Sequence, residues 1–137
     1  MSITGRCLCG SVIFECDDVG SAGYCHCDDC RRCTGSAFNI SVRCATSALR
    51  ILSGELGSFT KIGSSGAELT RSFCISCGSP VFTSSPLHPS VVYIKAGVLD
   101  DPGAIRPTLE AWVNSKVLWA TIPDGIESFA KSREGST

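Results

Sequence analysis

Cysteines are the residues of this sequence that are best placed to do chemistry. Ten of the 137 residues are cysteines, and eight of these are separated from another cysteine by only one or two intervening residues. They are Cys7 and Cys9; Cys25, Cys27, Cys30 and Cys33; Cys74 and Cys77. Disulfide frameworks spread their cysteines so that each bridge closes a long loop. Clusters this tight instead allow several thiolates to converge on one cation. The spacing therefore predicts a metal-binding protein of a reducing, cytoplasmic compartment.

Two of the clusters end in Cys-Gly. The motifs are Cys7-Leu-Cys9-Gly10 and Cys74-Ile-Ser-Cys77-Gly78. A tight turn after a ligand favours a positive φ, which glycine adopts without steric cost, and such a turn lets backbone N–H groups face the thiolates. Two turns of this kind supply four sulfurs, the closed tetrahedral set of a structural zinc site. One Cys-x-x-Cys pair alone would indicate buried or redox thiols, but two Cys-Gly turns together favour a metal.

A second set of ligands is predicted at Cys25, Cys27 and Cys30. Side chains of an extended segment repeat every two residues, so Cys25 and Cys27 point the same way. Cys30, in the first turn of a short helix, can fold back towards them. Three thiolates with a vacant fourth position are typical of a catalytic zinc. Cys33 follows three residues later and is either a fourth ligand that closes the site or a small cysteine outside it.

Charged and polar residues surround this second set. Arg31 and Arg32 are either contacts for a substrate carboxylate or a solvated helix end that the helix dipole favours. His26 lies between two ligands and is expected to point to the opposite side of the strand, as a packed or hydrogen-bonded imidazole. A proton-shuttling role beside the ligands is the alternative for His26.

The remaining candidates are assigned structural places. His88 is expected in a surface loop. Cys16 and Cys44 have no other cysteine nearby in the sequence and are expected to fill core positions. The sequence contains no nucleophile elbow, phosphate-binding loop or dinucleotide fingerprint.

Composition limits the classes of protein that these motifs can belong to. The length of 137 residues predicts one domain, residues 1–137. Charged residues make up 18% and the formal net charge is −1, which argues against disorder and against nucleic-acid binding through a basic surface. Apolar stretches are far too short to span a membrane. We expect neither a nucleic acid nor a membrane as a partner.

The elements that would position the cysteines are mainly short strands, so we predict a compact, mainly β fold with short helical turns. Along 11–16, Val12, Phe14 and Cys16 alternate with Ile13, which places the first three on one face. Further strands are predicted at 37–43, 56–62, 68–73, 81–83 and 91–96, with a hairpin connection at 63–66. One helix is predicted, from Asp28 to Thr34, with Gly35 as its stop. Residues 100–107 are predicted to be a long loop and Asp124-Gly125 a turn.

Together these motifs resemble the glutathione-dependent formaldehyde-activating enzyme family, which includes the centromere protein V relatives. The matching stretches are Gly5-Arg-Cys-Leu-Cys-Gly-Ser-Val-Ile-Phe14, Cys25-His-Cys-Asp-Asp-Cys-Arg-Arg32, Gly35-Ser-Ala-Phe38 and Phe73-Cys-Ile-Ser-Cys-Gly-Ser-Pro80, with weaker ones at 96–102 and 119–125. The resemblance implies an Mss4-like β fold with two zinc ions, one structural and one catalytic. Its structural ligands fall on Cys7, Cys9, Cys74 and Cys77, and its catalytic ligands on Cys25, Cys27 and Cys30. Cys33 departs from the family pattern, because that position is usually not a cysteine.

The resemblance implies a carbon–sulfur lyase-type enzyme similar to S-(hydroxymethyl)glutathione synthase. Such an enzyme condenses a small thiol, glutathione, with formaldehyde or a related carbonyl compound, and zinc coordination keeps the sulfur deprotonated. The alternative is a non-catalytic, zinc-stabilised binding module of the same family, which a ligating Cys33 would favour. A third hypothesis is a redox or metal-buffering protein in which Cys30 and Cys33 form a disulfide.

Overall fold

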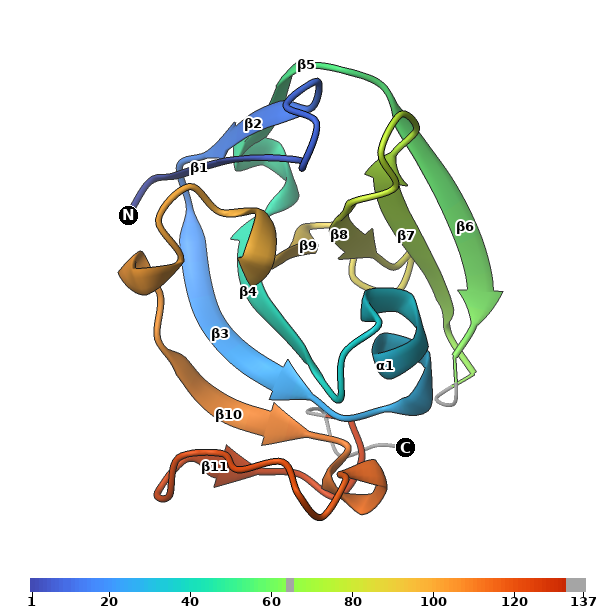
Figure 1. The fold of residues 1–137 in the computed structure, drawn as a ribbon, viewed down its shortest axis with the longest axis vertical. Helices are drawn as coiled ribbons and strands as arrows, with labels where there is room; N and C mark the ends of the chain where they lie inside the picture. Colours follow the sequence, from blue (N-terminus) through green and yellow to red (C-terminus); the bar gives the residue numbers. More distant parts are fainter. Residues whose placement is uncertain (64–65, 133–137) are drawn as a thin grey trace.

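A computed structural model of the chain describes residues 1–63 and 66–132. Figure 1 shows that this part is built mostly of strands, with α1 (Asp28–Thr34) as its one α-helix. Four 3-10 turns complete the helical segments described: η1 (Thr46–Ala48), η2 (Ala96–Val98), η3 (Pro102–Ala104) and η4 (Val113–Ser115). None of the helices in the described residues is long and apolar enough to cross a membrane.

The strands form two sheets. The smaller one has the order β1-β2-β5, from β1 (Ile3–Arg6), β2 (Ile13–Cys16) and β5 (Leu49–Ser53). The larger one has the order β11-β10-β3-β4-β9-β8-β7-β6. Its strands, in that order, are Glu127–Ser128, Pro107–Ala111, Val19–Cys25, Asn39–Ala45, Val91–Lys95, Pro80–Ser84, Glu68–Cys74 and Leu56–Ile62. Neighbours pair antiparallel, except that β10 runs parallel to both β3 and β11.

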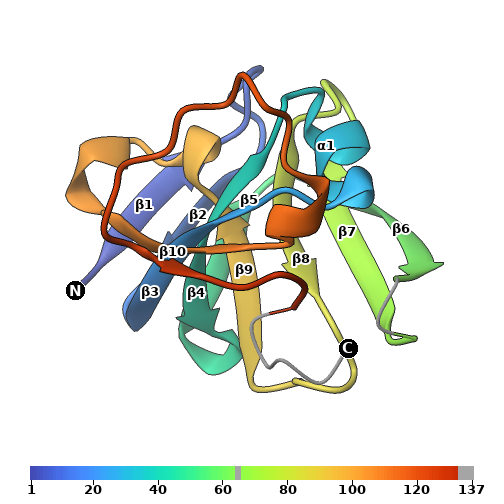
Figure 2. The same cartoon turned by 90° about the horizontal axis from the view of Figure 1, so that it is seen from below.

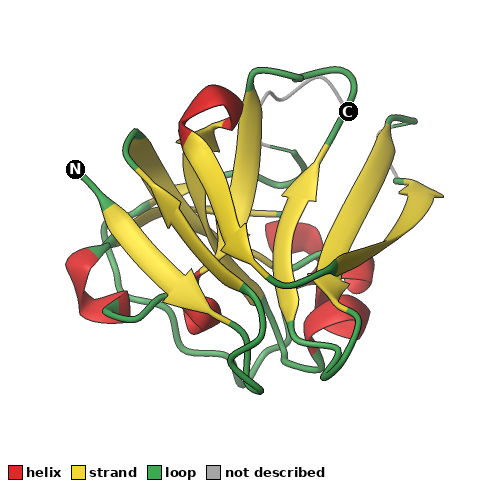
Figure 3. Cartoon of the chain, turned by 90° about the horizontal axis from the view of Figure 1, so that it is seen from above, coloured by secondary structure: helices red, strands yellow, loops and turns green. Residues whose placement is uncertain are grey.

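The large sheet bends around the segment that carries α1. Figure 1 shows β6 on one side of the bend and β10 on the other, with α1 between them. The view from below in Figure 2 shows α1 at one end of β7. Figure 3, which distinguishes helices from strands, shows the helical segments at the margins of the sheets. The bend therefore leaves one face of the large sheet turned towards the segment that joins β3 to α1.

Alternation along the strands separates the core from that face. Val42 and Cys44 of β4, and Val92 and Ile94 of β9, are buried in the apolar core. Successive side chains of a strand point to opposite sides, so the polar residues between them face the other way. The same rule holds at 11–16, where Val12 and Phe14 are fully buried and Ile13 is 39% exposed. This confirms the predicted alternation.

The predicted elements agree closely with the fold where the local pattern is strong. The helix spans Asp28–Thr34 as predicted, and Gly35 ends it in a left-handed conformation with φ 69°. Strand 56–62 also has its predicted bounds, whereas the strands predicted at 11–16 and 37–43 begin two residues later. Residues 64–65 of the predicted hairpin connection lie outside the described residues, and the flanking β6 and β7 pair antiparallel. The predicted loop at 100–107 contains η3, and Gly125 forms the predicted turn with φ 83°.

Cys16 and Cys44 require a correction. Both fill core positions as predicted, with 0% and 1% exposure, but the structure joins them as a disulfide. Cys16 lies on β2 of the small sheet and Cys44 on β4 of the large one, so the bridge connects the two sheets. Sequence spacing could not reveal this pair, because 28 positions separate the two residues.

Candidate metal centres

The first candidate metal centre consists of four thiols, those of Cys7, Cys9, Cys74 and Cys77. Their sulfur atoms all lie within 4.8 Å of one another. The Cys7 and Cys9 sulfurs are 3.6 Å apart, and those of Cys9 and Cys74 are 3.8 Å apart. A tetrahedron with metal–sulfur bonds of about 2.3 Å has edges of about 3.8 Å. The four thiols therefore have the dimensions that a tetrahedral zinc ion requires.

Two glycine turns hold this four-thiol group. Gly10 and Gly78 have φ values of 81° and 78°, in the left-handed region that glycine adopts most readily. Each turn is closed by a backbone hydrogen bond: the N–H of Gly10 donates to the carbonyl oxygen of Cys7 at 3.1 Å, and that of Gly78 to Cys74 at 2.8 Å. Both Cys-Gly turns thus have the conformation predicted from the sequence.

Hydrogen bonds favour the thiolate form at two of these four thiols, whereas the pKa of Cys9 is raised. Burial disfavours the charged form of Cys7, but the Val12 N–H, which donates to its sulfur at 3.3 Å, and the neighbouring thiols lower its pKa to about 7. The hydroxyl and backbone N–H of Ser79 lower the pKa of Cys77 to about 5. Thiolates are the form that binds metal, so the surroundings prepare these two sulfurs as ligands.

The second candidate metal centre consists of three thiols, those of Cys25, Cys27 and Cys30. Their sulfur atoms also lie within 4.8 Å of one another. Cys25 ends β3, Cys27 is the N-cap of α1, and the backbone N–H of Cys30 donates to the Cys27 sulfur at 3.2 Å. This contact turns Cys30 back towards the other two, as predicted. Cys33, one turn further along α1, is not a member of this three-thiol group.

Charge is unevenly distributed over the three-thiol group. Hydrogen bonds from Cys25 and then Cys30, the Cys30 N–H and the positive charge of Arg71 lower the pKa of Cys27 to about 2. The interactions with Cys27 and Cys30 raise the pKa of Cys25. The thiolate form is therefore favoured at Cys27 and disfavoured at Cys25. A divalent ion would remove this repulsion and allow all three thiols to ionise.

His26 anchors the segment between two of these thiols. Its side chain is buried, and its Nε2 lies 2.9 Å from Oε1 of Glu110 on β10. Glu110 also accepts hydrogen bonds from Ser128 at 3.1 Å and pairs with Lys116 at 3.3 Å. These partners hold the pKa of Glu110 below its usual value although burial opposes ionisation. The structure confirms a packed, hydrogen-bonded imidazole, on the side of the strand opposite the thiols.

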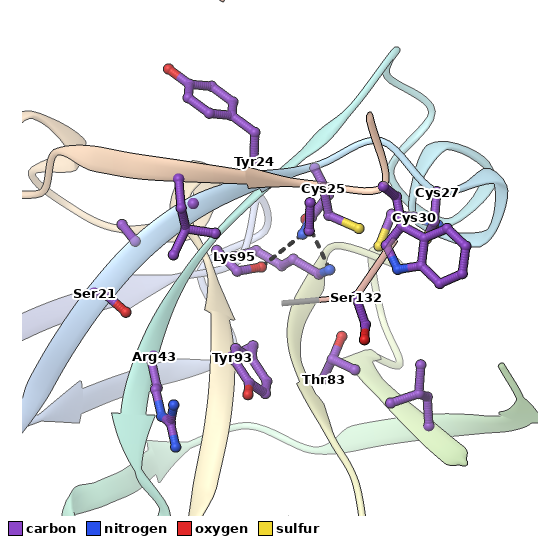
Figure 4. A pocket seen from close by; sticks show the side chains of 18 of the residues that line it. Ser21, Tyr24, Cys25, Cys27, Cys30, Arg43, Thr83, Tyr93, Lys95 and Ser132 are labelled. Carbon is purple, nitrogen blue, oxygen red and sulfur yellow. Dashed lines mark hydrogen bonds between the residues drawn. The ribbon is translucent and has the colours of Figure 1, made fainter. Parts of the chain in front are cut away.

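A cavity of about 230 Å³ adjoins the three-thiol group. Figure 4 shows Cys25, Cys27 and Cys30 at one end of it and Arg43 and Tyr93 at the other, with Lys95 between them. Arg71 and Thr83 also line it. The cavity is open to solvent on one side, and the three thiols form part of its wall. A small molecule that enters it therefore meets the sulfur atoms directly.

The basic residues of the cavity are not the two considered in the sequence. Arg31 pairs with Asp28 of its own helix at 3.5 Å, and Arg32 lines a second hollow with Asp29 and Lys61, which shares Cys27 and Trp112 with the cavity. The cations in the cavity are Arg43, Arg71 and Lys95, from β4, β7 and β9. Their signal was present in the sequence as charged residues inside otherwise apolar strand patterns, such as Lys95 after Val91–Ile94. A charge at a buried strand position marks a site more often than a core.

Trp112 is a further residue that sequence reasoning missed. It lines the same cavity and is the non-glycine residue of the described chain with a positive φ, 58°. Large side chains rarely adopt this conformation, and such strain clusters at functional sites. The N–H of Trp112 donates to the carbonyl oxygen of Lys131 at 2.9 Å, which holds the strained residue in place.

Comparisons with known proteins agree with this arrangement. Residues 2–115 match the family described as glutathione-dependent formaldehyde-activating enzyme. A crystal structure of a Rhodobacter sphaeroides protein is similar in fold, with a TM-score of 0.58 and 25% sequence identity over 73% of this chain and 88% of that chain. No curated protein matches the sequence significantly. The family match includes all seven cysteines of the four-thiol and three-thiol groups.

Proposed function

We propose, because this chain belongs to the glutathione-dependent formaldehyde-activating enzyme family, that it is a zinc-dependent enzyme acting on a carbon–sulfur bond. It would condense a small thiol such as glutathione with formaldehyde or a related carbonyl compound. The observation that supports this most directly is the three-thiol group in the wall of a cavity. Three sulfur ligands leave one position of a tetrahedral ion for substrate.

The chemistry of the two thiol groups fits two different zinc sites. The four-thiol group would hold a structural zinc, since its four sulfurs complete a tetrahedron. Cys25, Cys27 and Cys30 would hold a catalytic zinc. Cys33 stands outside the three-thiol group, which favours an open site over the closed site of a binding module.

The reaction is an addition of a thiol to a carbonyl group. Zinc bound by the three thiols would supply an electrophile that keeps the substrate sulfur deprotonated and polarises the carbonyl oxygen. The sulfur–carbon bond forms as the π bond of the carbonyl breaks, and the proton released by the thiol ends on the carbonyl oxygen. The product is an S-hydroxymethyl adduct, with no net oxidation or reduction. Thr83 and Tyr93 line the same cavity.

The fold keeps the reacting groups in position. Cys25 is fixed by the β3 ladder, and Cys27 and Cys30 by the first turn of α1. The His26–Glu110 contact secures the residue between the first two thiols. Pre-positioned groups lower the entropy cost of bringing two reactants together.

The experiment that tests this proposal is an exchange measurement by NMR. With purified, zinc-loaded protein, glutathione and labelled formaldehyde should form the S-hydroxymethyl adduct faster than without protein. Cys27→Ser should abolish the acceleration, and Cys33→Ala should keep it because Cys33 is not in the three-thiol group. An acceleration that survives Cys27→Ser would contradict the proposal.

A further inference from the structure

The face of the large sheet beside the three-thiol group is lined with cations. Lys95 and Arg71 line the cavity, and only 5% and 8% of their surfaces are exposed. Arg43, half-buried, is a third cation in the lining, and the described residues of the lining include no aspartate or glutamate. Burying a cation is costly unless an anion or several acceptors face it. The cavity therefore carries positive charge that its own lining does not neutralise.

Strand register shows how these cations lie relative to the thiols. Cys25 stands opposite Asn39, Ser41 opposite Lys95, and Arg43 opposite Tyr93. The β4 members of these pairs, Asn39, Ser41 and Arg43, follow one another at steps of two residues. The three pairs therefore lie on the same side of the sheet and face the cavity. Figure 4 shows the same order, with Lys95 between Cys25 and Arg43. Lys95 and the three thiols therefore line the same side of the sheet.

Arg71 closes the cavity from the neighbouring strands. It stands opposite Thr83, and Thr83 opposite Tyr93, so that one row crosses β7, β8, β9 and β4 and ends at Arg43. Arg71 lines the same cavity as Cys25, Cys27 and Cys30. Cations from three separate strands thus converge on one cavity.

Two buried polar atoms in this row have no hydrogen-bond partner among the described residues. They are Nε of Arg71 and the hydroxyl oxygen of Thr83, and their residues are register neighbours. Lys95 donates one hydrogen bond, to Oδ1 of Asn39 at 2.9 Å, although an ammonium group has three donors. Buried polar groups are nearly always satisfied in native proteins. Adjacent unsatisfied donors therefore indicate a ligand that accepts hydrogen bonds.

Charge indicates what that ligand carries. Three thiolates around a divalent ion carry one negative charge, and three cations leave the cavity with two positive charges to neutralise. A thiolate and a carboxylate on one molecule supply these two charges. The cavity of about 230 Å³ is open to solvent, so a longer ligand can extend beyond it.

We propose that Lys95, Arg71 and Thr83 form an anion subsite, and that the thiol substrate is a mercaptocarboxylic acid whose carboxylate binds there. This inference rests on the proposed function, because it assigns the second end of a ligand whose sulfur binds at the three-thiol group. Arg71 can hold the carboxylate with its planar guanidinium, and Lys95 of β9 supplies a second positive charge. Arg31 and Arg32 do not line this cavity.

The test is a calorimetric comparison of ligands that differ in one group. Zinc-loaded protein should bind 3-mercaptopropionate at least about tenfold more tightly than 3-mercapto-1-propanol, because hydrogen bonds between charged groups are the stronger kind. Propionate, which lacks the thiol, should compete with 3-mercaptopropionate on the wild-type protein.

Variants locate the subsite. Arg71→Gln and Lys95→Gln should each bring the acid-to-alcohol affinity ratio close to one while alcohol binding persists. Thr83→Val, nearly equal in size, should lower the ratio a few-fold and keeps the test valid if a charged-residue variant fails to fold. Arg106→Gln is the matched control, because Arg106 is exposed and does not line the cavity. It should leave the ratio unchanged.

The two proposals fail in distinguishable ways. Equal affinities of the acid and the alcohol, an unchanged ratio in Arg71→Gln, or no competition by propionate would overturn the anion subsite and leave thiol binding intact. Absence of binding by every thiol, in wild-type and variant alike, would overturn the proposed function itself.

Discussion

Nε2 of His26 lies 2.9 Å from Oε1 of Glu110, and the two residues are 84 positions apart in the sequence. The contact joins the segment between two of the three thiols to β10, a strand that the cavity also uses through Ala111. Glu110 is 6% exposed and accepts further hydrogen bonds from Ser128 and Lys116. One buried carboxylate therefore fixes three segments around the candidate catalytic centre.

Glu110→Gln should destabilise the protein at pH 7 by about 1–3 kcal/mol, since the amide leaves charged and polar partners poorly satisfied. The pKa of Glu110 is lowered in the folded state. Its stabilising effect is therefore present above the ordinary carboxyl pKa of about 4.3 and disappears as the pH falls through the lower folded value. Urea denaturation at several pH values should show the gap between wild type and variant closing in acid. Glu127→Gln, at an exposed position, should show no such gap.

Cys27→Ser should lower the zinc content from two ions per chain to one. Serine is a poor zinc ligand, and the four-thiol group does not include Cys27. Cys33→Ala is the matched control and should retain two ions. Elemental analysis of the purified proteins gives the counts. Loss of zinc from Cys33→Ala would show that Cys33 is a ligand and that the second centre is closed.

Gly78→Ala should destabilise the four-thiol group by about 1–2 kcal/mol, the cost of a left-handed conformation for an L-residue. No atom lies within 4 Å of the added methyl group, and φ is 78°, so the effect is one of backbone strain alone. Gly97→Ala also adds a methyl group to open space, without a positive φ. Thermal unfolding of both variants isolates the strain. Equal melting temperatures would contradict the role of the Gly78 turn.

Removal of the Cys16–Cys44 disulfide by a double alanine substitution should cost roughly 3–4 kcal/mol under oxidising conditions. Loop-closure entropy for the sequence separation of 28 gives this magnitude. Alkylation after denaturation and zinc removal should label eight thiols without reductant and ten with it. Ten labelled thiols without reductant would show that the pair is reduced in the purified protein.

Local patterns explain why the two thiol groups could be predicted. The Cys-Gly turns, the alternation around Phe14 and the helix that carries Cys30 are each determined by residues within a few positions. The strand 19–25 was missed, because Gly20 and Gly23 interrupt any apolar alternation. Gly23 is needed there because a methyl group would collide with Leu109 on the parallel strand β10. That requirement is tertiary and has no local signal.

The lining of the cavity could not be predicted from the sequence for the same reason. Arg71, Thr83 and Tyr93 become neighbours only through strand pairing. Arg31 and Arg32 were considered as substrate contacts because they stand beside the cysteines in the chain, but one of them pairs with Asp28 and neither lines the cavity. Proximity in sequence was a poor guide to proximity in the cavity.

Alternate residues of β4 and β9 face opposite sides, so Val42 and Ile94 belong to the core while Arg43 and Lys95 face the cavity. The same two strands therefore determine both ligand specificity and stability, but through different residues. During evolution the cavity-facing residues of these strands can be substituted and alter which ligand binds. The alternate residues, which face the core, keep the fold intact.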